Sequence, residues 1–158
     1  MSYRVVPVSD QFVDDLFARL HAERSETLTR AASAAQSRER VVAAACVWWD
    51  DFCQIVERKA QAWNAKDATD AHVTCTRNAS GSIVLWHRSI ETELRLAEAR
   101  VVMTSRTGDT RPRESPFIQF NEARGAVVAV LASDSAATSP TAAADHALTP
   151  IFTRAFKG

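Results

Sequence analysis

The chain has 158 residues, of which 46% are apolar, and it carries 19 basic and 19 acidic residues. A chain of this size buries a hydrophobic core without disulfides or metals, so we expect one domain over 1–158. Zero net charge argues against a nucleic-acid partner, because such binding depends on an excess of basic residues. It does little to oppose self-association.

Targeting and redox signals favour a cytoplasmic protein. Residues 1–7 lack the apolar core of a signal peptide. The longest apolar run, Val41–Trp49, falls far short of the ~20 residues that span a bilayer, so we expect no membrane association. The three cysteines, Cys46, Cys53 and Cys75, form no C-x-x-C motif and are expected to be reduced thiols.

The distribution of glycine and proline divides the chain into two halves. Neither residue occurs between Pro7 and Gly81, whereas all four glycines lie at or after position 81. Both residues interrupt regular structure. We therefore expect an α+β fold, with helices over 1–66 and an antiparallel sheet over 70–132.

The first half predicts a helical hairpin, with a single bent helix as the alternative. Phe12–Leu20 has apolar residues at three- and four-residue steps, which form one stripe. Ala22–Arg40 keeps helix-forming residues but contains only one large apolar side chain, Leu28. Ser25 and Ser37 are candidate caps at which a hairpin turn could begin.

Val41–Trp63 carries the clearest amphipathic pattern. Its apolar residues cover about half of the helix circumference, which suits a helix packed across a sheet. Trp48 and Trp49 lie in this apolar arc and are expected to anchor the core, with ligand stacking as the functional alternative.

The second half predicts five or six strands in an antiparallel meander, because the connections are too short for parallel crossovers. Residues 71–77 and 83–87 alternate around a turn at Asn78–Gly81 and predict a hairpin. Ser89–Ala99 fits either strand or helix, and we favour strand. Arg106–Pro116 reads as a polar loop, and residues 117–120 and 126–131 predict a closing hairpin.

The C-terminal part predicts a tether followed by a short docking helix. Residues 133–147 are small and polar, which is typical of a flexible linker. Residues 148–157 predict a helix capped by Thr149 with Pro150 in its first turn. A helix this short is unstable alone, so its apolar side chains must dock on this chain, on another subunit or on a partner: Leu148, Ile151, Phe152 and Phe156.

No recognised catalytic motif is present, and the four histidines have no metal-ligand spacing, so we expect no metal and no cofactor. His87 follows Trp86 on a predicted strand and could act as an acid or base if it approached Glu91 or Glu93. A second weak candidate is an anion site formed by three arginines of one polar loop. These are Arg106, Arg111 and Arg113.

Two functions follow from these patterns. The first is a non-enzymatic interaction or self-assembly module, acting as a homo-oligomer or with a protein partner through helix faces and the C-terminal helix. The alternative is a small-molecule-binding protein or small enzyme with a pocket between a curved sheet and the long helix. Its candidate liners are Trp48, Trp49, Trp86 and His87, with the arginine loop at the mouth.

Overall fold

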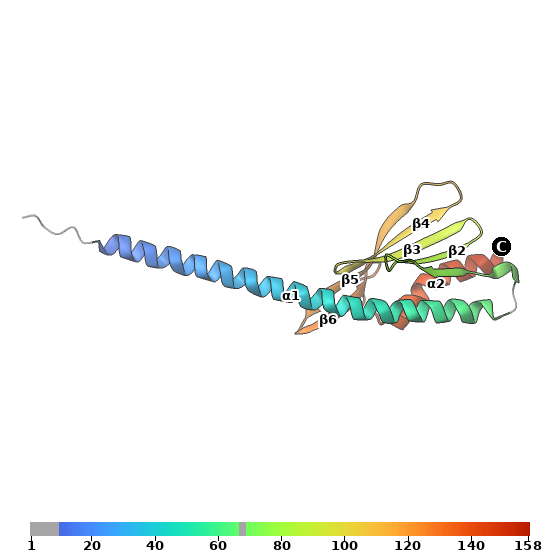
Figure 1. Ribbon diagram of the computed structural model, residues 1–158, viewed down its shortest axis with the longest axis horizontal. Coiled ribbons are helices and arrows are strands. Elements are labelled where there is room, and N and C mark those ends of the chain that lie inside the picture. Colours follow the sequence, from blue (N-terminus) through green and yellow to red (C-terminus); the bar gives the residue numbers. More distant parts are fainter. Residues whose placement is uncertain (1–9, 67–68) are drawn as a thin grey trace, which may run out of the picture. The chain divides into compact units, whose positions relative to one another are not determined.

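A computed structural model of the chain describes residues 10–66 and 69–158. The expectation that residues 1–7 form no signal peptide lies outside these ranges. Figure 1 shows a long helix, an antiparallel sheet and a second helix. The elements are α1 (Gln11–Asn64), η1 (Thr69–Ala71), β1 (Thr74–Arg77), β2 (Ile83–His87), β3 (Ile90–Ala97), β4 (Arg100–Thr107), β5 (Arg113–Ala123), β6 (Ala126–Leu131) and α2 (Pro140–Lys157).

The described chain forms two compact units. One ends at Arg38 and consists of the first part of α1, and the other runs from Glu39 to Gly158 and contains the sheet. The expectation from chain length that residues 1–158 form one domain stays a prediction.

The predicted helical hairpin is wrong, because α1 is one continuous helix of 54 residues. Ser25 and Ser37 lie inside the helix and cap no break. The span between them contains no glycine or proline and is rich in alanine, the strongest helix former. The hydroxyls of Thr27 and Thr29 donate to carbonyl oxygens four residues earlier, so these polar side chains are accommodated within the helix.

The predicted antiparallel meander is confirmed, with six strands in the order β1-β2-β3-β4-β5-β6. Ser89–Ala99 contributes β3, which confirms the strand that we favoured over a helix for this segment. The connections are tight. At the β5–β6 turn, Arg124 and Gly125 both have positive φ, of 52° and 77°, which is the backbone of a two-residue type I′ hairpin loop.

The predicted polar loop Arg106–Pro116 is shorter than expected, since β4 continues to Thr107 and β5 begins at Arg113. The register between these strands shifts at Val101/Val102: Val101 faces Ile118 and Val102 faces Pro116. Phe117 is therefore the extra residue of a β-bulge, where a proline without an N–H is tolerated. The bulge buries both Phe117 and Ile118.

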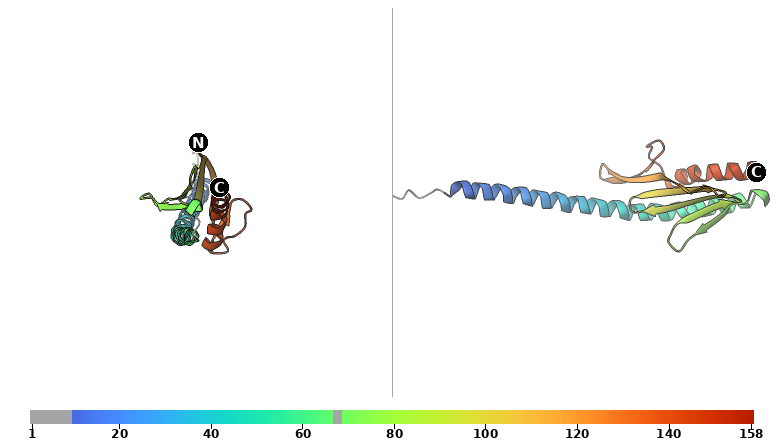
Figure 2. Two further views of the ribbon diagram at one scale, coloured as in Figure 1. Left: turned by 90° about the vertical axis from the view of Figure 1, so that its right-hand side faces the viewer. Right: turned by 90° about the horizontal axis from the view of Figure 1, so that it is seen from above.

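One face of the sheet carries the core. Two helical segments lie side by side against this face, as the two views of Figure 2 show: helix α2 and the C-terminal part of α1. The half-circumference arc predicted for Val41–Trp63 is the buried face of α1. The largest fully buried side chains come from all of these layers: Phe52, Ile83, Leu85, Leu94, Ile118 and Leu148.

Helix α2 begins at Pro140, so residues 140–147, expected to belong to a flexible linker, are helical. The Ser139 side chain accepts a hydrogen bond from the Ala142 N–H, and Pro140 occupies the first turn. Ala143, Ala144 and Ala147 are buried. Small side chains give little hydrophobic signal in a sequence, but they let the helix backbone lie close to the core. Thr149 and Pro150 lie within the helix and do not start it.

Candidate functional site

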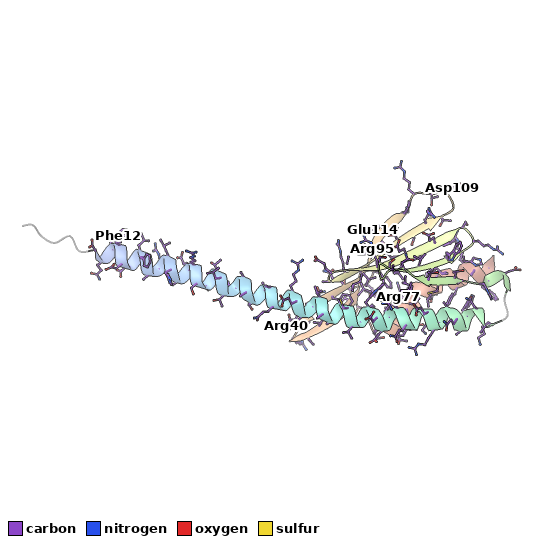
Figure 3. The ribbon with its side chains drawn as sticks, viewed as in Figure 1. Phe12, Arg40, Arg77, Arg95, Asp109 and Glu114 are labelled. Carbon is purple, nitrogen blue, oxygen red and sulfur yellow. The ribbon has the colours of Figure 1, made fainter. Side chains whose placement is uncertain are left out.

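The most exposed apolar surface in the described chain lies on the first unit. Five large side chains of α1 are more than half exposed: Phe12, Val13, Phe17, Leu20 and Leu28, at 75%, 59%, 70%, 52% and 62%. We call this set the N-terminal apolar face; Figure 3 labels Phe12 near the start of the helix. The sequence predicted the stripe but assigned it to a packed hairpin. Because α1 continues without a break over Gln11–Asn64, the second helix of the predicted hairpin does not cover this stripe in the described residues.

Local interactions on the same segment support the helix without covering the face. Arg30 pairs with Glu26, and Arg19 lies 4.0 Å from Glu23. Both pairs have i,i+4 spacing and are exposed, so each contributes a few tenths of a kcal/mol, roughly. The Phe17 ring contacts His21 at 6.1 Å between centroids, yet remains largely exposed.

A second apolar surface lies where the end of α1 meets α2. Trp63 stacks on Phe152 with ring centroids 4.4 Å apart, and Phe156 meets Trp63 edge-on at 6.5 Å. Lys59 Nζ lies 2.7 Å from Asp145 Oδ1 across the two helices. A groove of about 320 Å³ runs between them. We call this the α1–α2 groove.

The predicted interface residues of the C-terminal helix divide between core and surface. Leu148 and Ile151 are buried in the core of their own chain, and Phe152 is half-buried against Trp63. Phe156 remains 74% exposed. Docking within the chain therefore takes up most of this apolar stripe.

The four aromatic and histidine candidates do not converge on one pocket. Trp49 is buried, and its Nε1 donates to the Gly81 carbonyl oxygen at 3.1 Å. Trp48 stacks on Phe52 at 5.2 Å and meets Phe120 edge-on. Trp86 is 48% exposed, and the alternating burial of β2 places it on the sheet face opposite the core.

His87 is buried on the core face, and its Nδ1 donates to the His72 carbonyl oxygen at 2.7 Å. This bond fixes the tautomer, because a carbonyl oxygen only accepts. Nε2 is buried without a hydrogen-bond partner. Glu91 and Glu93 face Trp86 and Val84 across the strands, on the opposite side of the sheet. The predicted approach of His87 to these carboxylates is therefore wrong.

The three arginines are not gathered on one loop. Arg106 belongs to β4 and donates to Glu91 at 3.4 Å, whereas Arg113 begins β5. Ser105 lies directly opposite Arg113, so alternation puts Arg106 on the other face of this hairpin. Arg111 is exposed in the connecting loop. The open sheet face carries a second pair, Arg95 with Glu114 at 3.2 Å, both labelled in Figure 3.

A smaller cavity of about 260 Å³ lies between α2 and strands β3–β5. Its polar lining comes from the side chains of Thr92, Ser105, Ser115 and Ser133, together with exposed His146. The His146 ring lies against Phe117, with centroids 6.1 Å apart. No charged side chain lines this cavity, and none of the sequence-predicted ligand residues does. The predicted pocket between sheet and long helix stays a prediction.

Within residues 10–66 and 69–158, no group of three or more His, Cys, Asp or Glu side chains is placed to hold a metal ion. Within the same ranges, no helix combines the length and apolar character that crossing a membrane requires. Comparison of the chain with family models, curated proteins and solved structures finds no match in any of the three.

Proposed function

We propose that the chain is a non-enzymatic interaction module that associates with itself through the N-terminal apolar face of α1. The observation that carries the proposal is the exposure of Val13, Phe17 and Leu20, which are 59%, 70% and 52% exposed and lie on one side of the helix. Single exposed apolar residues are ordinary, but a contiguous set of large ones is typical of an interaction site.

Helix stability supports the same proposal. The helical segment before Arg38 belongs to a unit separate from the sheet and its core. Helices in proteins gain most of their stability from packing an amphipathic face rather than from helix propensity. Association would supply the missing packing.

The charges around the face favour a protein over a lipid surface. Residues 10–26 contain five acidic and two basic residues. Helices that lie on membranes are typically rich in lysine and arginine on their polar side, because lipid headgroups are often anionic. An acidic segment of this kind is repelled by such a surface.

The C-terminal helix contributes less to the proposed interaction than its sequence suggests. With Leu148 and Ile151 in the core, Phe156 beside the α1–α2 groove is its main remaining apolar contact. We include this groove as a secondary contact surface for a protein partner. A small-molecule site has less support, because its expected liners point to different faces.

Sedimentation velocity over a concentration series tests the proposal. We expect the full chain to form oligomers as its concentration rises, and Phe17→Glu to weaken association at least ten-fold. A buried charge without a partner is strongly unfavourable in an apolar contact. The same substitution leaves the folded unit from Glu39 onward unchanged by circular dichroism.

Ala18→Glu is the matched control. Ala18 is exposed, adjacent in sequence and about 100° further around the helix, on the side away from Val13 and Leu20. It introduces the same residue and the same charge. A chain that is monomeric at every concentration, or equal association of both variants, would overturn the proposal.

A further inference from the structure

The N-terminal segment of α1 contains a seam with the spacing of a coiled coil. Alternating steps of three and four residues connect seven positions that lie on one side of the helix. These are Val13, Phe17, Leu20, Arg24, Thr27, Ala31 and Ala34. All seven are exposed, so the whole seam is available to a second helix.

Side-chain size along the seam changes from one end to the other. Its first three members are large and apolar, whereas Ala31 and Ala34 at the far end are small, as are their neighbours Ala32 and Ala35. Parallel pairing would stack large on large and small on small, leaving the alanine end poorly filled. It would also put Arg24 against its own copy, and like charges at a seam are repulsive.

We infer that the occupant of this face is the same segment of a second copy, running antiparallel. Phe17 then lies opposite Ala34, Leu20 opposite Ala31 and Arg24 opposite Thr27. Phe17 and Leu20, the two large side chains nearest the centre of the contact, each meet an alanine, which fills space evenly there. The inference rests on the proposed self-association and adds the partner segment and its direction.

The distribution of charged residues along the segment favours antiparallel pairing. Residues 10–26 hold five acidic and two basic residues, whereas residues 27–38 hold two basic residues and no acidic one. Antiparallel copies place the acidic end of one helix beside the basic end of the other. Parallel copies place the acidic ends together. Opposite charges flanking a seam set partner orientation.

The large apolar residues of the seam are open to a second copy. Val13, Phe17 and Leu20 are 59%, 70% and 52% exposed. Pairing two copies therefore removes three large apolar side chains of each helix from water, which stabilises the pair.

Distances between spin labels on the two copies test the direction. Single cysteines replace Ala18, Ser25 and Gln36, all exposed and directed away from the seam, in a Cys46→Ser background. From a rise of 1.5 Å per residue, antiparallel copies separate the two labels along the axis by about 2 Å at position 25, about 20 Å at 18 and about 30 Å at 36. Parallel copies give the same distance at all three positions.

The outcomes separate this inference from the proposed function. Dimers with the distance order 25, 18, 36 support the antiparallel pair. Dimers with three equal distances overturn the antiparallel inference and leave self-association standing. A chain that sediments as a monomer, with no distance between copies, overturns both. Each labelled variant must sediment like the unlabelled chain for its distance to be used.

Discussion

Cys53 and Cys75 show how the core constrains a single ionisable group. Burial raises the pKa of the Cys53 thiol to about 12 and that of Cys75 to about 11, from an ordinary value of 9.0. Desolvation is the main cause, because it disfavours the charged thiolate. For Cys53 it outweighs the opposing effect of Arg77, whose guanidinium donates to Asp50 at 2.6 Å.

The raised values predict a loss of stability in alkali. Below the unfolded thiol pKa both states hold the proton, so the contribution to stability is fully present there. It is lost as the pH rises toward the folded values. We expect the free energy of unfolding to fall between pH 9 and pH 11. Cys53→Ala is expected to make this fall smaller, by an amount on the order of 2 kcal/mol.

Denaturant titration at several pH values measures this slope. Cys46→Ala is the control, because Cys46 is exposed. An equal effect of the two substitutions on the slope would show that burial of Cys53 does not hold its proton.

At the scale of elements, α2 is held by its own chain. Leu148 is 1% exposed and Phe156 is 74% exposed, although both belong to one apolar stripe. We expect Leu148→Ala to lower the free energy of unfolding by about 3 kcal/mol, since it removes packed side-chain atoms and leaves a cavity. Phe156→Ala is expected to change it by less than about 0.5 kcal/mol.

Thermal or denaturant unfolding of both variants measures the difference. If the two substitutions have similar small effects, α2 is not docked on its own sheet and the contact must come from another molecule.

The elements also show what the sequence could predict. The strands were predictable because alternation and turn residues are local signals, and β3 followed from its continuity with β4. The continuity of α1 was not predictable, because Ala22–Arg40 is equally compatible with a solvent-exposed helix and with a connection between two helices. The start of α2 was missed because alanine carries little hydrophobic signal, although Ala143, Ala144 and Ala147 are buried.

The candidate site was predicted unevenly for the same reason. Periodicity identified the stripe around Phe17, but whether a stripe is buried depends on what else folds against it. Trp48 and Trp49 were correctly expected in the apolar arc that covers the sheet. The separation of Trp86 and His87 to opposite faces followed from alternation. That Trp48, Trp49, Trp86 and His87 do not converge on one pocket could be seen only from the three-dimensional register of the strands.

At the scale of the whole molecule, the two units have different expected partners. The unit from Glu39 to Gly158 has a continuous core of its own, drawn from α1, the sheet and α2. In the described part of the unit before it, residues 10–38, the large apolar side chains Phe12, Phe17 and Leu28 are all more than 60% exposed. We expect the first to be stable at any concentration and the second to be protected only when copies meet.

Hydrogen exchange of the full chain at low and high concentration tests this account most directly. We predict that amides of residues 11–38 exchange more slowly as concentration rises, while amides of β2 to β5 exchange at a constant rate. Exchange in residues 11–38 that does not depend on concentration would contradict the claim that this face binds a second copy.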